Sequence, residues 1–153
     1  MFAKKHLGVL AVSILISAVA AAEPAANRGR AAQLEGTWVV TVDLHNPPPF
    51  LPETFSALET YSRGGGLVTG NDMQQGPGQG SWEKDGDEYA VSILFFVRDA
   101  DNATTGSIRV RHRVTLDGAD SYTGTGEADL FDAAGVPLGT VPFTTIGQRL
   151  AAQ

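Results

Sequence analysis

Three side chains in this sequence have the chemistry needed to transfer protons or to orient a bound molecule: His112, Glu59 and Tyr122. His112 stands in a run where Val110 and Val114 occupy alternate positions, so an extended chain places its imidazole on the apolar face. A buried imidazole near neutral pH can transfer a proton or hydrogen-bond a ligand. The alternative is a core histidine whose nitrogens are satisfied by a tyrosine or a backbone carbonyl.

The sequence pattern allows two orientations for the side chain of Glu59. It shares parity with Phe55, which would place the carboxylate inside, whereas the opposite parity turns Leu58 inward and leaves Glu59 in solvent. A buried carboxylate is costly unless it has hydrogen-bond donors. An inward Glu59 near His112 or Tyr122 would form an acid–base set or a set that orients a ligand.

Several other chemistries are excluded by what the sequence lacks. The 153 residues contain no cysteine, which removes disulfides, thiolate metal sites and cysteine nucleophiles. His45 and His112 have no third ligand at a suitable spacing, so we expect no metal and no cofactor. The glycine-rich segment 76–80 lacks the Lys-Ser/Thr ending of a phosphate loop, and no Gly-x-Ser-x-Gly nucleophile elbow occurs.

The elements that would position these residues are β-strands. Apolar and polar residues alternate in a series of short runs, separated by turn signals such as Asp85-Gly86 and Asp117-Gly118. The expected strands lie at about 36–45, 54–63, 67–71, 81–84, 88–98, 107–116, 121–132 and 136–150. Strands in series with short links predict an all-β fold, an antiparallel, roughly eight-stranded up-and-down β-barrel. A two-sheet sandwich is the competing architecture.

Such a barrel would have an interior lined by large side chains. At about eight strands the interior is either just filled or holds one small ligand. Gly124 and Gly126 on an inward face remove side-chain volume, which leaves a cavity or lets a neighbouring aromatic ring fill the space. The side chains expected to line the interior and contact a ligand are Tyr61, Trp82, Tyr89, Phe95, Val110, His112, Tyr122 and Phe143.

The N-terminal residues have the pattern of an export signal. Lys4 and Lys5 give a positive start, residues 7–18 are apolar, and Ala20-Ala21-Ala22 offers small residues for cleavage near Ala22. The apolar run is shorter than the roughly 20 residues of a membrane span, a retained anchor being the alternative. We therefore expect a signal peptide at 1–22, a flexible linker at 23–33, a β-barrel domain at 34–151 and a periplasmic or secreted protein.

The charge of the chain bears on its partners. The formal net charge is −6, and removal of the signal peptide takes away two lysines and no acid, which makes it −8. An acidic surface disfavours nucleic acid and anionic membranes. Arg109, Arg111 and Arg113 form an outward basic stripe, expected to pair across strands with Glu127 and Asp129. A strip that binds anions or a partner is the alternative for these arginines.

Gly36-Thr37-Trp38 opens the first expected strand, and Arg149 stands near the end of the last. This combination resembles the signature of the calycins, the superfamily of lipocalin-like barrels. The resemblance implies that Trp38 closes one barrel end and that the guanidinium of Arg149 packs across its indole, a cation–π contact worth roughly 0.5–2 kcal/mol. Gly36, Trp38 and Arg149 are therefore expected to be structural residues.

A wider pattern resembles a family of small bacterial barrel proteins, mostly uncharacterised, that carry the Gly-Thr-Trp tag. The resemblance covers residues 34–150 approximately, with motifs Gly36-Thr37-Trp38, Pro47-Pro48-Pro49, Phe55-x-Ala57-Leu58, Gly76-Pro77-Gly78-Gln79-Gly80-x-Trp82, Tyr122-x-Gly124 and Gly147-Gln148-Arg149. A histidine often stands in that family where this chain has Gln79, so a role of that histidine would not carry over. The resemblance implies the barrel fold and supplies no agreed activity.

These observations predict an exported barrel that binds a small, largely apolar molecule. One alternative is an enzyme of the allene-oxide-cyclase-like type, a cyclase or isomerase, in which His112, Glu59 or Tyr122 handles protons. Another is a module with a solid core and no ligand. The expected partner is a small molecule rather than nucleic acid, and no membrane span is left once the signal peptide is removed. The sequence indicates no particular oligomeric state.

Overall fold

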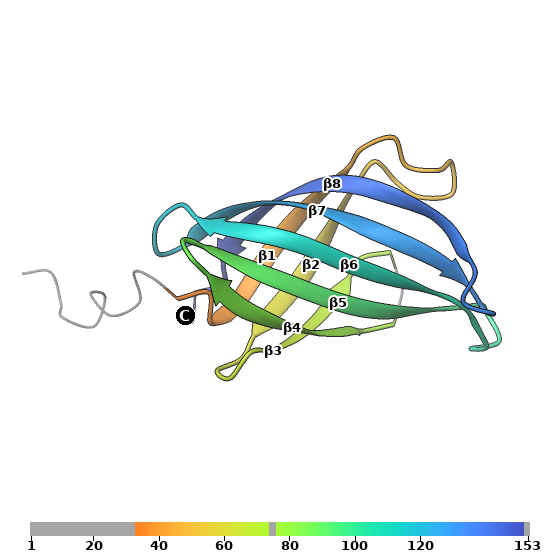
Figure 1. The fold of residues 1–153 in the computed structure, drawn as a ribbon, viewed down its shortest axis with the longest axis horizontal. Coiled ribbons are helices and arrows are strands. Elements are labelled where there is room, and N and C mark those ends of the chain that lie inside the picture. Colours follow the sequence, from red (N-terminus) through yellow and green to blue (C-terminus); the bar gives the residue numbers. More distant parts are fainter. Residues whose placement is uncertain (1–32, 74–75, 152–153) are drawn as a thin grey trace, which may run out of the picture.

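The structure of the protein is a computed structural model that describes residues 33–73 and 76–151. Its strands form one closed antiparallel barrel in which each strand pairs with its neighbours in the sequence and β8 pairs with β1 (Figure 1). The strands are β1 (Gly36–Leu44), β2 (Thr54–Tyr61), β3 (Gly66–Asn71), β4 (Gly78–Asp85), β5 (Glu88–Arg98), β6 (Thr104–Leu116), β7 (Ser121–Asp132) and β8 (Pro137–Arg149). The predicted all-β up-and-down barrel is confirmed, and the sandwich alternative is wrong.

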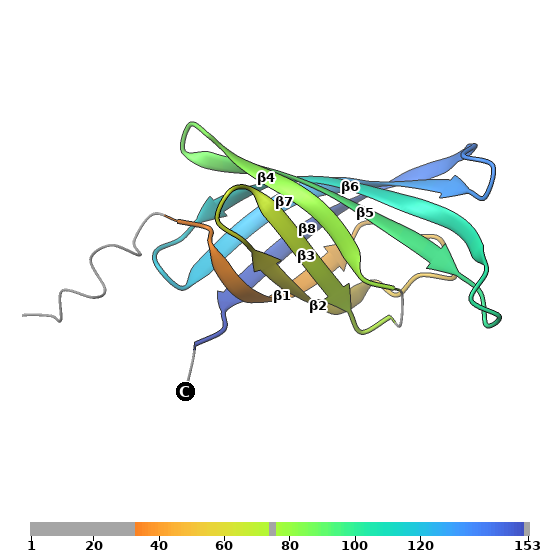
Figure 2. The same ribbon diagram turned by 90° about the horizontal axis from the view of Figure 1, so that it is seen from below.

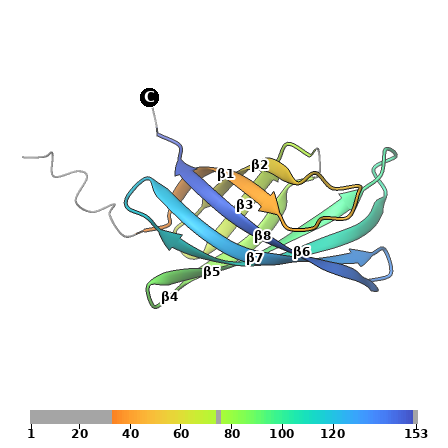
Figure 3. The same ribbon diagram turned by 90° about the horizontal axis from the view of Figure 1, so that it is seen from above.

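Two further views show how the barrel closes. Figure 2 shows β3 and β4 side by side along one wall, and Figure 3 shows β8 beside β1 on the opposite side. Trp38 in β1 lies opposite Glu59 in β2 and opposite Arg149 in β8. Every strand therefore pairs on both sides over at least part of its length, and none is a free edge strand. The described residues include no helix that is long and apolar enough to cross a membrane.

The predicted signal peptide and linker cannot be compared with the structure. Residues 1–22 lie outside the described residues, and so does the linker at 23–33 apart from Gln33. The predicted domain at 34–151 contains all of the strands.

The burial pattern of β1 shows why its sequence forms a barrel wall. Trp38, Val40 and Val42 are 0–6% exposed, whereas Val39 between them is 45% exposed. Side chains with period two therefore alternate between core and solvent. The same alternation places Glu59 inside, at 4% exposure, and Leu58 outside, at 48%. This settles the parity of β2 that the sequence left open.

The fourth strand begins earlier than the sequence predicts. We expected a glycine-rich loop before Ser81, but Gly78 already belongs to β4. A Cβ on Gly78 would overlap the ring of Phe95, and a Cβ on Gly80 would overlap the backbone of Ser92. These glycines allow close approach inside a strand, and without side chains they give no alternating pattern to detect.

One end of the barrel is closed by Trp38 and Arg149, as the resemblance implied. The guanidinium carbon of Arg149 lies 4.1 Å from the centroid of the Trp38 ring. Arg149 also donates hydrogen bonds to the backbone oxygens of Glu35 (2.6 Å) and Ala119 (2.8 Å). Gly36 has a φ of 127° and lies under this guanidinium, where a Cβ would collide with Nη1 of Arg149. Both features favour glycine at this position.

Aromatic rings fill the barrel interior next to this closed end. Tyr122 packs against Trp38 with ring centroids 5.0 Å apart, and Trp82 lies 6.2 Å from Tyr61 and 5.7 Å from Tyr89. A Cβ on Gly147 would overlap the ring of Tyr122, so that ring occupies the space above an inward glycine. This half of the barrel is a packed core.

The outward arginines pair across strands. Arg111 forms ion pairs with Asp129 (2.7 Å) and Glu127 (3.7 Å). Arg113 pairs with Asp85 and Glu88 on the other side. The predicted cross-strand pairing with Glu127 and Asp129 is confirmed for Arg111, and such exposed pairs contribute little to stability.

Candidate functional site

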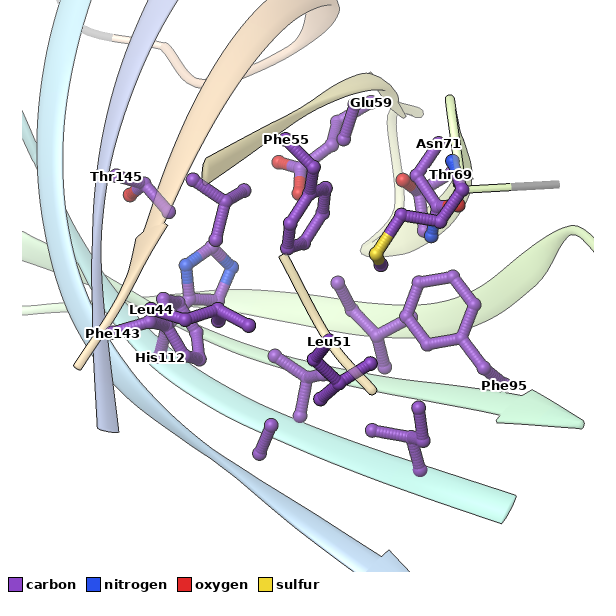
Figure 4. A pocket seen from close by; sticks show the side chains of 17 residues that line it. Leu44, Leu51, Phe55, Glu59, Thr69, Asn71, Phe95, His112, Phe143 and Thr145 are labelled. Carbon is purple, nitrogen blue, oxygen red and sulfur yellow. The ribbon is translucent and has the colours of Figure 1, made fainter. Parts of the chain in front are cut away.

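A cavity of about 70 Å³ lies inside the half of the barrel away from the closed end. Figure 4 shows it from close by, with side chains from several strands converging on one space. Its lining is mostly apolar, with four buried polar side chains. The lining residues are Val42, Leu44, Leu51, Phe55, Ala57, Glu59, Thr69, Asn71, Met73, Ile93, Phe95, Ile108, Val110, His112, Ala128, Phe143 and Thr145.

The segment between β1 and β2 forms part of the cavity mouth. Pro47-Pro48-Pro49 fixes φ in this segment, and the amide of Leu51 donates to the carbonyl of Pro48 at 2.9 Å. Leu51 lines the cavity, while Phe50 is 73% exposed. Met73, which follows β3, also lines the cavity. Two flexible apolar side chains outside the strands, Leu51 and Met73, therefore border the cavity.

Glu59 is held by two tyrosines from the packed half. The hydroxyls of Tyr61 and Tyr122 both donate to Oε2 of Glu59, at 2.5 and 3.0 Å. Burial, and then the charge of Glu59, raise the pKa of Tyr61 and of Tyr122 above their ordinary values. Both phenols consequently keep their protons at neutral pH. Their role in this arrangement is to donate hydrogen bonds and fix the carboxylate.

His112 points into the cavity without a partner. Its two ring nitrogens are buried and have no hydrogen bond to any described residue. The ring is 4% exposed and lies 5.9 Å from the ring of Phe143. Burial lowers the pKa of His112 below its ordinary value, and the charge of Glu59 opposes that shift. At neutral pH the imidazole is uncharged, with one nitrogen that donates and one that accepts.

Two threonines complete the polar part of the lining. Thr69 in β3 and Thr145 in β8 are 2% and 3% exposed, and neither hydroxyl oxygen has a hydrogen-bond partner among the described residues. The sequence analysis missed both. Their parity could have revealed them, because Thr69 alternates with Leu67 and Thr145 with Phe143 on inward faces.

We call Glu59, Thr69, His112 and Thr145 the polar cluster. Its members come from β2, β3, β6 and β8 and all line the same cavity. Buried polar groups in native proteins are almost always hydrogen-bonded, so unpaired ones need an explanation. A molecule held in the cavity, whether water or a ligand, can supply partners to groups that face it.

The residues predicted to contact a ligand divide between the two halves of the barrel. Phe95, Val110, His112 and Phe143 line the cavity. Tyr61, Trp82, Tyr89 and Tyr122 face inward but are absent from its lining, because they pack near the closed end. For these four, contact with a ligand stays a prediction.

The inward glycines have two effects. A Cβ on Gly126 would overlap His112 and the ring of Phe143, so this glycine lets both side chains pack against β7. A Cβ on Gly124 would lie 2.5 Å from Oγ1 of Thr145. Neighbouring side chains therefore fill the space beside these glycines, and those side chains in turn form one wall of the cavity.

A metal site is not formed by the residues that the structure describes, in which no three His, Cys, Asp or Glu side chains gather suitably. His45 is exposed, at the end of β1, with its Nε2 3.4 Å from the hydroxyl of Thr144.

No protein-family model and no curated protein matches this chain. A solved structure of EF1p2_mFAP2b bound to DFHBI is similar in fold, with a TM-score of 0.51 and 18% sequence identity. The match covers 76% of this chain and 94% of that one. At this identity the likeness concerns the fold alone. The chain is thus an eight-stranded antiparallel β-barrel with one packed half and one hollow half.

Proposed function

We propose that this protein binds a small, largely apolar molecule inside its barrel. The observation that carries the proposal is the cavity itself, whose apolar wall surrounds a few converging polar groups without partners. Ligand sites in proteins have this composition, since apolar burial supplies affinity and the polar groups set orientation.

A solid-core module explains these observations less well. In a core without a ligand, an unpaired buried hydroxyl or imidazole only costs stability, and an apolar residue of similar shape would remove that cost. Here His112, Thr69 and Thr145 all bear such unpaired groups and all face one space. The packed half, in contrast, pairs the Glu59 carboxylate with two phenols and the Trp38 indole with the carbonyl of Leu34.

The size of the cavity limits what it holds. Pockets for drug-sized ligands occupy roughly 300–1,000 Å³, whereas this one has about 70 Å³. Cavities that bind benzene have about 150 Å³, so a substituted ring would already have to displace side chains at the mouth. Leu51 and Met73 are the side chains placed for this, and the unbranched methionine adapts readily. EF1p2_mFAP2b, which is similar in fold, is bound to DFHBI, and this supports a small-molecule ligand for a protein of this fold.

We also propose that the protein is related to the calycins and that it is exported. The contact between Arg149 and Trp38 at the closed end supports the calycin relationship. The charge and apolar pattern of residues 1–22 supports a signal peptide, with the barrel domain at 34–151 acting in the periplasm or outside the cell.

The test is a titration of isotope-labelled protein with ethylbenzene, followed by backbone amide NMR. We expect saturable shifts at residues that line the cavity. Ala128→Phe should abolish them, because Ala128 lines the cavity and a ring at that position would occupy it. Thr125→Phe places the same ring on the outward face of the same strand and should leave them intact. Failure to saturate, or shifts that persist in Ala128→Phe, would refute the proposal.

A further inference from the structure

We propose that the cavity selects an uncharged molecule with a hydroxyl group, an alcohol or phenol on an apolar body, over a carboxylate or an ammonium. This inference rests on the proposed function and specifies the ligand class of the same site. It follows from the charges and hydrogen-bonding groups that face the ligand space.

A carboxylate does not suit the polar cluster. Glu59 is the acidic group of the lining, and the lining residues include no lysine and no arginine. Arg149 packs on Trp38 at the closed end, and Arg109 lies over Phe131 on the outward face of the barrel, so neither cation lines the cavity. A ligand carboxylate would have to lose its hydration beside Glu59 without a cationic partner, which is strongly unfavourable.

An ammonium does not suit the cluster either. Glu59 offers a negative charge, and the hydrogen bonds that Tyr61 and Tyr122 donate to its Oε2 already stabilise that charge without a cation. An ammonium has donors only, so it cannot accept from the N–H of His112. That buried donor would stay unpaired, since His112 has no partner among the described residues.

A ligand hydroxyl can supply the hydrogen-bond partners that the polar cluster lacks. The uncharged imidazole of His112 presents one donor and one acceptor, and Thr69 and Thr145 each present a hydroxyl that does both. A ligand hydroxyl donates and accepts at a single atom, so it can pair with the imidazole and with a threonine. The body of the ligand would then contact rings such as Phe55, Phe95 and Phe143. Figure 4 shows the side chains of His112 and Glu59 pointing into the space that these rings border, with Thr145 at its edge.

The experiment compares four molecules with the same ring and alkyl group: 4-ethylphenol, 4-ethylbenzoate, 4-ethylbenzylamine and ethylbenzene. Their affinities for the full-length protein are measured at neutral pH by the amide NMR titration. We expect 4-ethylphenol to bind about tenfold or more tightly than each of the others, because sites built to pair a hydroxyl reject analogues that lack it.

The variants Thr69→Val and Thr145→Val, alone and together, remove hydroxyls while keeping the cavity's shape. In the double variant the advantage of 4-ethylphenol over ethylbenzene should shrink severalfold, while the affinity for ethylbenzene stays the same or improves. Thr123→Val, an outward threonine of β7, is the matched control and should leave the preference unchanged.

The outcomes separate this inference from the proposed function. Binding of ethylbenzene as tight as that of 4-ethylphenol, or tighter binding of the benzoate or the benzylamine, overturns the hydroxyl preference and leaves the proposed function standing. An advantage for the phenol that survives in the double variant and in His112→Leu assigns the preference to groups other than Thr69, Thr145 and His112, and also overturns it. Absence of binding by all four molecules overturns both proposals.

Discussion

Individual residues of the polar cluster destabilise the fold. Glu59, Thr69, His112 and Thr145 are all at most 4% exposed, yet three of them have unpaired polar atoms among the described residues. Desolvation without a partner is costly, so these side chains lower the free energy of unfolding of the unliganded protein. Residues that break the rules of core packing in this way mark functional sites.

Replacement of a cluster threonine by valine should therefore stabilise the barrel. Thr145→Val removes a buried hydroxyl that has no partner among the described residues, and we expect the free energy of unfolding to rise by about 1–3 kcal/mol. Urea denaturation measures the change. Thr123→Val, on the exposed face of β7, should change stability by about 0.5 kcal/mol or less. A loss of stability in Thr145→Val would show that its hydroxyl already has a strong partner.

His112 should make stability depend on pH in a defined window. Its folded pKa lies below the ordinary value of 6.5, so the unfolded chain takes up the proton first as the pH falls. Above about pH 6.5, His112 is uncharged in both states and has no effect on the pH dependence of stability. As the pH falls below this value, the free energy of unfolding declines until the pH has passed the folded pKa. Among cavity-lining residues, Glu59 is the other titratable group that faces this imidazole.

Urea denaturation of the wild type and two histidine variants between about pH 7.5 and pH 5 tests this window. His112→Leu should have a shallower decline than the wild type. His45→Leu, at an exposed position, should behave like the wild type. Equal slopes in all three proteins would mean that His112 is not buried and neutral.

The strands show how far alternation alone leads. Period-two patterns predicted all the strands of the barrel, because one face of each is buried. Six of them agree to within two residues at each end, whereas β4 and β6 begin three residues earlier than predicted. The start of β4 was missed, since Gly78 and Gly80 have no side chains to alternate. The facing of Glu59 stayed open because Leu58 and Ala57 are both apolar, and only the partner strands decide between them.

The glycines of β7 are needed for packing between neighbouring strands, and Gly126→Ala tests this. The added methyl group would collide with His112 and with the ring of Phe143, so we expect a loss of about 1–3 kcal/mol in urea denaturation. Gly70→Ala in β3 is the matched control, because nothing lies within 4 Å of the added Cβ. It should be neutral or mildly stabilising. Equal effects of the two changes would show that strand propensity, rather than contact with β6 and β8, decides.

The molecule as a whole divides along the barrel axis into a packed half and a hollow half. The sequence indicates which side chains face inward, but not where each one lies along the barrel axis. The position along the axis depends on the stagger between paired strands. This stagger places Gly126, for example, opposite both His112 and Phe143. For this reason Tyr61, Tyr89 and Trp82 were assigned to the ligand space although they pack near the closed end.

Export is the prediction that concerns the full chain. When the complete sequence is expressed in a bacterium with a general secretory pathway, we expect the protein in the periplasmic fraction or the medium. Mass spectrometry of the purified protein should give an N-terminus at Glu23, after cleavage at Ala22. Lys4 and Lys5 changed to Glu should reduce processing. Intact chain in the cytoplasm or held in the membrane would refute cleavage at this site.

Both ends of the described chain leave the barrel at the same end (Figure 1), where Arg149 packs on Trp38, and the cavity lies in the other half. Leu34 accepts a hydrogen bond from the indole of Trp38, and the amide of Leu150 donates to Thr37 next to it. Attachment to a bead, a sensor chip or a fused enzyme through either end would therefore orient every molecule with its opening toward the sample. Together with the proposed function, this placement makes the barrel a scaffold for immobilised capture of small apolar compounds without redesign.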